Sequence, residues 1–236
     1  MAINQYGQEV GEPLPNWIPA ARPQLITLEG KYVRLVPLRT AGVVEQLITT
    51  IKDNNLLTSP MWTYLPIGDF SDTNQLQTVL EQHAKSDDPL HYAIVDVHTG
   101  AVEGSIALMR IDPNNGVIEV GWLIFTPALQ RTVKSTELHY LLMQYVFDKL
   151  GYRRYEWKCD ALNAPSVNAA LRLGFIYEGT FSNAVVYKGR NRDTAWFSIT
   201  AQRWPNCRDA FTAWLSPQNF NPDGTQRHRL SELRTS

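Results

Sequence analysis

The segment 130–137, Gln-Arg-Thr-Val-Lys-Ser-Thr-Glu, gathers cations and hydroxyl groups at the expected start of a helix. Its basic and hydroxyl side chains are Arg131, Thr132, Lys134, Ser135 and Thr136. The first amides of a helix have no intrahelical acceptor and carry partial positive charge, so this position suits phosphate oxygens. The alternative is ordinary capping, in which Thr132 accepts from first-turn amides and both cations are solvated. The glycines of a phosphate-binding loop or a dinucleotide fingerprint are missing.

Glu119 is the candidate acid–base residue. It alternates with Val117, Gly121, Leu123 and Phe125, which predicts a carboxylate on an otherwise apolar strand face. Burial there would raise its pKa toward a value useful for proton transfer. The alternative is a solvated or ion-paired glutamate without a chemical role.

Other conspicuous side chains are interpreted as structural. His83 and His139 lie in expected helices, and Cys159 has no nearby histidine or metal-ligand spacing. No metal site is predicted, because the two cysteines are not clustered. A basic cluster at 188–193 falls in an expected hairpin turn, where it is either solvated or contacts an acidic substrate or partner.

Composition excludes several classes of protein. The chain has 236 residues, 44% of them apolar, and a formal net charge of −1. A charge near zero disfavours a general nucleic-acid binder, which needs a basic face. The N-terminus lacks the order of a signal peptide, and the longest apolar run, 120–129, is too short to span a bilayer. We therefore expect a cytoplasmic protein with no nucleic-acid or membrane partner.

The elements that must position these residues follow from periodicity and turn signals. Residues 1–28 contain four prolines and are expected to form an extended arm held by Trp17. Helices are expected after Thr40, after Ser71 or Asp72, and at 132–150, 164–173 and 209–215. Strands are expected at 32–38, 91–97, 102–110, 117–125, 155–159, 175–180, 184–188 and 194–200.

Two kinds of strand connection define the fold. Tight turns join the strands between residues 91 and 125, which predicts an antiparallel meander. The helix at 132–150 separates strands 117–125 and 155–159, and such a crossover places them parallel. The fold class is therefore α+β, with a mostly antiparallel sheet of about seven strands, flanking helices and one parallel pair. Ligands are expected where the carboxyl ends of that pair meet the crossover helix.

The strand 117–125, the turn 130–137, the segment Asn163-Ala164-Pro165-Ser166 and the run 173–179 together resemble the GCN5-related N-acetyltransferases. Within that family, these segments are most similar to the branch that includes the ribosomal-protein N-terminal acetyltransferases. The resemblance covers about residues 30–204 and implies a catalytic domain at 29–204 followed by an extension at 205–236. It also implies acetyl transfer from acetyl-CoA by direct attack of an amine on the thioester.

The resemblance assigns the cosubstrate site. The two parallel strands splay apart and admit the pantetheine arm, and a backbone amide within Leu123, Ile124 and Phe125 donates to the thioester carbonyl. Asn163 holds the arm. The turn in this family has the form Gln/Arg-x-x-Gly-x-Gly/Ala, whose amides bind the pyrophosphate; this chain keeps Gln130 but has Val133 and Ser135 at the glycine positions. The pyrophosphate contacts are therefore expected from residues 130–136, with hydroxyl groups substituting for close backbone approach.

The same resemblance assigns proton transfers. An alkylammonium with a pKa of about 10.4 is protonated at pH 7, so a base must accept its proton. Glu119 matches a glutamate of the family in this strand. Ser166 matches a position that protonates the departing thiolate, although it could also simply cap the helix at 164–173, and Tyr187 is a second candidate acid.

The acceptor remains open at this stage. A protein N-terminus, a lysine and a small amine all fit the implied reaction, and the chain could act as a monomer or a homodimer. Two other classes also remain: a regulatory module that binds acetyl-CoA without turnover, and an interaction domain that does not bind it.

Overall fold

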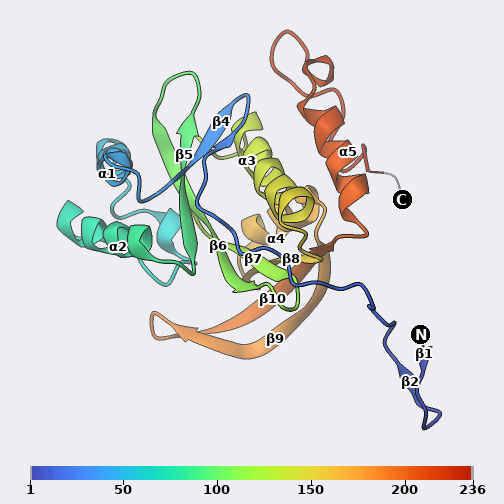
Figure 1. Ribbon diagram of the computed structural model, residues 1–236. Helices are drawn as coiled ribbons and strands as arrows, with labels where there is room; N and C mark the ends of the chain where they lie inside the picture. Colours follow the sequence, from blue (N-terminus) through green and yellow to red (C-terminus); the bar gives the residue numbers. More distant parts are fainter. Residues whose placement is uncertain (1, 235–236) are drawn as a thin grey trace.

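The computed structural model describes residues 2–234 and is centred on one eight-stranded sheet with the order β3-β4-β5-β6-β7-β8-β10-β9 (Figure 1). The strands of this sheet are β3 (Leu28–Glu29), β4 (Val33–Pro37), β5 (Leu90–Asp96), β6 (Val102–Asp112), β7 (Val117–Phe125), β8 (Arg154–Asp160), β9 (Ile176–Tyr187) and β10 (Arg190–Thr200). Neighbouring strands are antiparallel except β7 and β8, which are parallel. The predicted α+β class, with one parallel pair, is confirmed.

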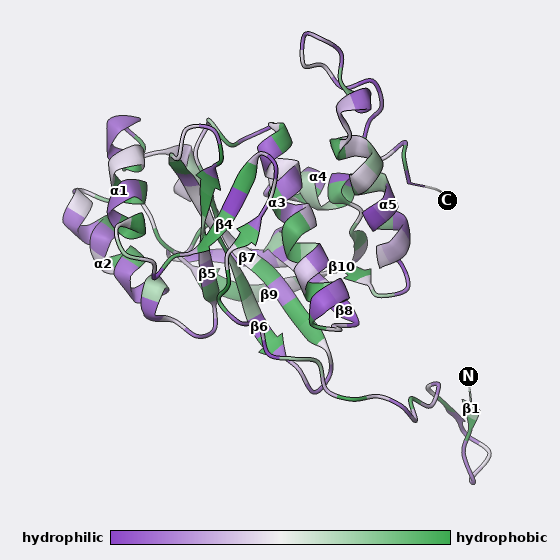
Figure 2. Ribbon diagram, turned by 45° about the horizontal axis from the view of Figure 1, so that its top comes forward, coloured by the Kyte–Doolittle hydropathy of each residue, from purple (hydrophilic) through white to green (hydrophobic). Residues whose placement is uncertain are grey.

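Helices cover both faces of the sheet. They are α1 (Val43–Asp53), α2 (Thr73–Lys85), α3 (Val133–Gln144), α4 (Ala164–Leu173) and α5 (Trp204–Leu215), with short helical turns at Pro60–Trp62, Tyr145–Lys149 and Pro217–Asn219. In Figure 1, α1 and α2 lie to one side of the sheet, and α3, α4 and α5 lie to the other. The central strands are apolar in Figure 2, and the polar residues of the helices lie mainly toward solvent.

Two apolar cores follow from this layering. One packs α1, α2 and the loop around Trp62 on the strands β5 and β6. The larger one packs α3, α4 and α5 on the opposite side, and includes Tyr155 and Trp157 of β8. Because successive strand residues point to opposite faces, Glu156 and Lys158 of the same strand must lie on the other face from these aromatic rings.

Some element boundaries differ from expectation. Thr40 does not cap α1, whose N-cap is Gly42 with a φ of 80°. The expected strands at 175–180 and 184–188 are one strand, β9, in the structure, and α5 begins at Trp204 rather than Asp209. Asp72 caps α2 by accepting from two backbone amides, as the sequence predicted.

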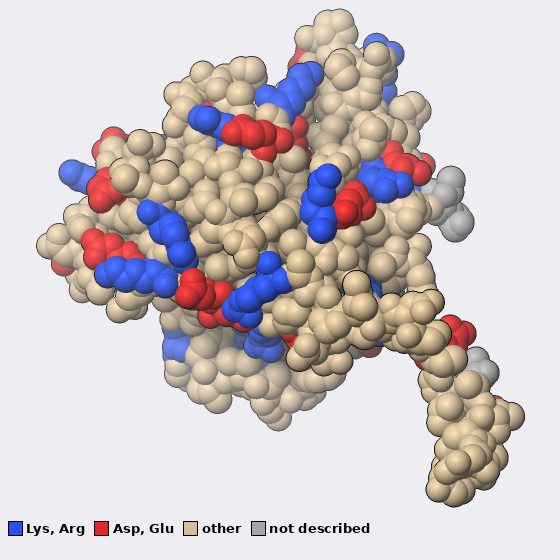
Figure 3. All heavy atoms as spheres, in the orientation of Figure 1, with Lys and Arg blue, Asp and Glu red and all other residues tan. Residues whose placement is uncertain are grey.

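The N-terminal arm extends away from the sheet, whereas the C-terminal segment begins with α5, which packs beside α3 (Figure 1). The arm contains a small hairpin of β1 (Ala2–Ile3) and β2 (Glu9–Val10) and then runs extended. Trp17 anchors it, since its Nε1 donates to the Asn114 carbonyl at 2.9 Å. Among residues 2–234, no helix has both the length and the apolar character needed to cross a membrane. Charged side chains of both signs alternate over the face in Figure 3, consistent with a net charge near zero.

Candidate active site

The parallel strands β7 and β8 separate halfway along their length. Their pairing runs from Val117 with Arg154 to Val120 with Trp157, and no further pair joins them within residues 2–234. The carboxyl-terminal halves of the two strands therefore diverge without ladder pairing, and this region next to the starts of α3 and α4 is called the wedge below. This is the splay that the sequence analysis predicted at the carboxyl ends of the parallel pair.

A β-bulge lies on β7 at the mouth of this wedge. Trp122 and Leu123 together face the single residue Ile106 of β6, where the register shifts. Trp122 has a φ of 53°, which bulky residues seldom adopt. Of the three candidate amides for the thioester carbonyl, only that of Leu123 lies in the bulge, since Ile124 and Phe125 rejoin the ladder with β6.

The start of α3 presents backbone amides. Those of Arg131, Thr132, Val133 and Lys134 have no hydrogen-bond acceptor in the described part of the chain. Arg131 has a φ of 59°, and its side chain is exposed. Gln130 donates through Nε2 to the Phe125 carbonyl at 2.8 Å, which fixes the turn between β7 and α3. Amides without an acceptor at a helix start are what anion binding requires, so the predicted anion site at this turn stays a prediction.

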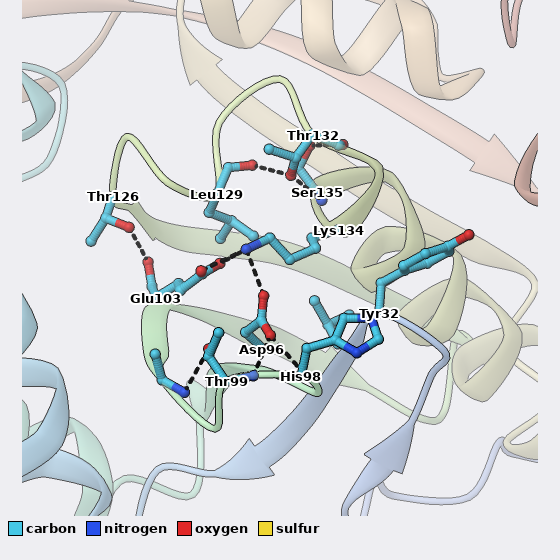
Figure 4. Close-up of polar contacts among 12 residues, drawn as sticks. Tyr32, Asp96, His98, Thr99, Glu103, Thr126, Leu129, Thr132, Lys134 and Ser135 are labelled. Carbon is cyan, nitrogen blue, oxygen red and sulfur yellow. Dashed lines mark hydrogen bonds and ion pairs between the residues drawn. The ribbon is translucent and has the colours of Figure 1, made fainter. Parts of the chain in front are cut away.

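Lys134 does not supply a free cation to that end. Its Nζ lies 2.8 Å from Asp96 Oδ2 and 2.5 Å from Glu103 Oε2, so α3 is clamped to the hairpin between β5 and β6 (Figure 4). Burial alone would raise the pKa of Asp96, but hydrogen bonds from Lys134 and from the amides of Thr99 and His98 lower it to about 2. The predicted phosphate contact by the Lys134 side chain is therefore corrected to a structural ion pair.

The hydroxyl groups of this turn are also engaged. Thr132 donates to the Leu129 carbonyl and Ser135 donates to the Thr132 carbonyl, each at 2.7 Å (Figure 4). Thr136 is buried and accepts from the Arg172 guanidinium at 3.0 Å. The protons of Thr132 and Ser135 are thus already donated to the backbone, which contradicts the expectation that these hydroxyls substitute for glycine amides.

Glu119 is buried, and its surroundings are charged rather than apolar. Its Oε2 lies 2.8 Å from Lys158 Nζ and 3.3 Å from Arg110 Nε. The expected apolar face is wrong because β8 runs parallel beside β7 and places Glu156 and Lys158 on the same side. Burial raises the pKa of the Glu119 carboxyl, and the two cations offset part of that increase.

Asn163 and Ser166 lie at the start of α4. Asn163 is the N-cap, and its Oδ1 accepts from the Ser166 amide at 3.2 Å. One interpretation of the sequence was that Ser166 caps this helix; the cap is Asn163 instead. The Ser166 Oγ accepts from Trp157 Nε1 at 3.0 Å, and the hydroxyl also hydrogen-bonds the Cys159 thiol, whose pKa burial raises and this hydrogen bond lowers.

Tyr187 ends β9 and reaches the carboxyl end of β8. Its Oη donates to Asp160 Oδ2 at 2.8 Å. Burial and this hydrogen bond to a carboxylate raise the pKa of Tyr187 to about 12. The proton of Tyr187 is thus held more firmly than in a free tyrosine.

Sequence reasoning missed the partners of Glu119. Lys158 also binds Glu156 at 2.7 Å, and its ammonium lies 3.8 Å from the centre of the Trp196 ring. The signal was present, because charged residues alternate with aromatic and sulfur-containing ones through 154–159. His83, interpreted as a packing residue, does pack: its ring stacks on His91 at 4.1 Å and contacts Trp122 at 4.8 Å.

Comparisons with known proteins agree with this geometry. Residues 43–176 match the family model described as an acetyltransferase (GNAT) domain. A GCN5-related N-acetyltransferase from Brucella melitensis is 44% identical, with 94% of this chain and 99% of that one covered and a TM-score of 0.89. A probable GNAT-family acetyltransferase from Chromobacterium violaceum is 33% identical, with 84% and 98% covered and a TM-score of 0.76.

A curated relative gives the same assignment at lower identity. The uncharacterized N-acetyltransferase p20 of Bacillus licheniformis is 25% identical over 144 residues, which are 60% of this chain and 80% of that protein. The family match covers more than half of the chain and includes the wedge, the bulge and the amide turn. This chain is therefore an acetyltransferase and belongs to the GCN5-related N-acetyltransferase (GNAT) family, which uses acetyl-CoA.

Proposed function

We propose that the protein transfers the acetyl group of acetyl-CoA to a primary amine by direct attack of the amine on the thioester. The observation that carries this proposal is the coincidence of three features at one end of β7. They are the separation of β7 from β8, the bulge at Trp122 and Leu123, and the unpaired amides at the start of α3. Together they suit a thioester arm that ends in a pyrophosphate.

Each part of the donor has a candidate binding element. The pantetheine arm lies in the wedge beside Asn163, and the pyrophosphate accepts hydrogen bonds from the amides of 131–134. The Leu123 amide in the bulge donates to the thioester oxygen. That contact strengthens as negative charge develops on the oxygen, which is the condition for catalysis by differential binding.

The reaction needs a base for the acceptor ammonium and an acid for the departing thiolate. Glu119 accepts a proton from the acceptor ammonium, directly or through water, and the neutral nitrogen attacks the carbonyl carbon. The carbon–nitrogen bond forms, the carbon–sulfur bond breaks, and the thiolate takes a proton from Ser166. The excess proton on the acetylated nitrogen passes to the Ser166 oxygen, and Glu119 releases its proton to solvent. Tyr187 is the alternative donor, although its raised pKa and its bond to Asp160 make it the weaker acid.

The acceptor approaches beside two segments that contact each other. Lys188, in the turn between β9 and β10, donates through Nζ to the Trp62 carbonyl at 2.8 Å. Tyr64 in the same loop donates to the Leu162 carbonyl at 3.1 Å. These bonds connect the loop at 54–70 to the end of the wedge, so we assign this loop to the acceptor side. A protein N-terminus, a lysine side chain and a small amine all remain candidate acceptors.

Thiol release from acetyl-CoA tests the proposal when it is measured against a panel of amines. The panel contains peptides with free N-termini, N-acetylated peptides with one lysine, and small amines. We expect amine-dependent release of CoA and formation of an N-acetyl product by mass spectrometry. Binding of acetyl-CoA without turnover of any amine would favour a regulatory module, and no binding at millimolar ligand would refute the donor site.

A further inference from the structure

A cavity of 510 Å³ opens between the C-terminal extension and the start of α3. Its lining includes Tyr32, Val133, Phe220, Asn221 and Arg227. This volume lies within the range of small-ligand sites, about 300–1,000 Å³. The family match ends at residue 176, so one wall of this cavity comes from a part of the chain outside it.

That wall is an ordered loop. A β-bridge joins Phe220 to Gln226, and the Asn221 amide donates to the Thr225 carbonyl at 2.9 Å. Asn219 is buried and fixes the base of the loop, since its Nδ2 donates to the Trp214 carbonyl at 3.1 Å. These contacts order the loop that follows α5 in the chain (Figure 1).

The side chains that face this cavity combine aromatic rings with a cation. Arg227 donates through Nε to Asn221 Oδ1 at 3.0 Å, while its terminal nitrogens have no partner among residues 2–234. The carboxylate of the loop, Asp223, instead accepts from the amide and hydroxyl of Thr225. Arg227 can therefore bind an anion, and the rings of Tyr32 and Phe220 offer a surface for a planar base.

The cavity adjoins the proposed donor site at Val133. Val133 lines it and also contributes one of the open amides at the start of α3. A ligand whose pyrophosphate lies on these amides can place its next chemical group in the cavity. In acetyl-CoA that group is adenosine with a 3′-phosphate, which provides a planar base and a second anion.

We propose that the C-terminal extension completes the donor site, with Arg227 binding the 3′-phosphate and the adenine lying against Tyr32 and Phe220. This inference rests on the proposed function, because it extends the acetyl-CoA site. It assigns a role in donor recognition to residues 217–227.

Calorimetric titration with CoA and with 3′-dephospho-CoA tests this assignment. We expect the protein to bind CoA about tenfold more tightly than 3′-dephospho-CoA, the size of one charge-assisted hydrogen bond. Arg227→Ala should lose this preference and bind both ligands alike. Arg229→Ala is the matched control, since Arg229 is exposed, lies outside the cavity lining and pairs weakly with Glu232 at 3.9 Å; it should keep the preference.

The outcomes separate the two proposals. Equal binding of CoA and 3′-dephospho-CoA by the unaltered protein overturns the role of Arg227 and leaves the donor site intact. A preference that survives Arg227→Ala also overturns it. Failure of the unaltered protein to bind either ligand refutes the proposed function and, with it, this inference.

Discussion

Replacing Glu119 with glutamine separates a catalytic role from a structural one. Glutamine keeps the shape of the side chain but cannot accept a proton from an ammonium group. A positioned general base accounts for about 10²- to 10⁴-fold in rate, which corresponds to about 3–5 kcal/mol of transition-state stabilisation. We expect kcat/KM for the amine to fall within this range, while the Kd for acetyl-CoA changes less than about twofold, a small free-energy difference.

The structure indicates why this variant should remain folded. Lys158 keeps a carboxylate partner in Glu156 at 2.7 Å, and the Arg110 side chain is 60% exposed, so water can solvate it. Of the two cations that contact Glu119, the buried Lys158 therefore keeps a carboxylate partner. The loss of stability should therefore be close to that of a single charged hydrogen bond, about 1–3 kcal/mol.

Glu156→Gln provides the matched control. Glu156 also binds two cations, Arg154 at 2.6 Å and Lys158 at 2.7 Å, and its side chain is 10% exposed. It lies on the neighbouring strand β8, directly opposite Glu119. We expect Glu156→Gln to lose similar stability in urea denaturation while keeping kcat/KM within about threefold, as for a group outside the chemical step.

Initial rates of thiol release across pH 5–10 complete the assay. Because burial raises the pKa of Glu119, the unaltered enzyme should lose active base as pH falls through that raised pKa, in addition to the loss of neutral amine. In Glu119→Gln, the rate should depend on pH only through the fraction of the acceptor amine that is neutral. Equal rate losses in Glu119→Gln and Glu156→Gln, with unchanged pH profiles, would refute the role of Glu119 as a base.

Three further changes have distinct expected results. Ser166→Ala should lower kcat about tenfold or more. Tyr187→Phe should lower kcat less, because the pKa of Tyr187 is raised to about 12. Steady-state kinetics at saturating acetyl-CoA compare the two variants, and a larger loss in Tyr187→Phe would make Tyr187 the acid in place of Ser166. Asp96→Asn should lower the free energy of unfolding by about 2 kcal/mol at pH 7. This stabilisation is present above the unfolded pKa near 4 and is lost as pH falls toward the folded pKa of about 2, so urea denaturation of variant and parent should converge at pH 2. Gly68→Ala should destabilise the protein by about 3 kcal/mol in the same assay, because Gly68 has a φ of 124° and an added Cβ would lie 2.2 Å from the Cβ of Trp62.

Local signals sufficed wherever an element is bounded by its own residues. The sequence predicted α4 with its observed bounds, because a proline occupies its first turn and Gly174 ends it with a φ of 104°. It also predicted β7 from 117 to 125 as observed. In both cases the apolar pattern and the residue that ends the element indicate the same boundary, and tertiary packing leaves that boundary unchanged.

Local signals gave the wrong strand boundaries where pairing with a neighbouring strand determines how far a strand extends. The expected break between residues 180 and 184 lies near two residues of β9 with positive φ values, Gly179 and Asn183. The ladder with β10 nevertheless continues past them through register shifts between Arg192 and Thr194 and between Trp196 and Phe197. In place of a break, β9 has two β-bulges or irregularities, because β10 forms ladder hydrogen bonds with β9 on both sides of each shift.

Charge assignments at the site failed for a related reason. Lys134 follows a turn that resembles a phosphate site, yet its partners Asp96 and Glu103 come from the hairpin between β5 and β6, more than thirty positions earlier. Glu119 likewise meets Lys158 only because the crossover helix sets β8 beside β7. A single sequence gives the alternation along each strand, but not the register that pairs one strand's charges with another's.

The engagement of Lys134 changes where the donor's charge must be balanced. A pyrophosphate on the amides of 131–134 would lie beside a lysine already paired with two carboxylates, a cluster with a formal charge of −1. The amides and the helix dipole alone would have to offset both this cluster and the ligand. The guanidinium groups of Arg131 and Arg227, which form no ion pair with any residue in 2–234, can supply the missing positive charge. This requirement gives the C-terminal extension an electrostatic reason to lie at the start of α3, and it predicts that CoA affinity falls with ionic strength more steeply in the parent protein than in Arg227→Ala.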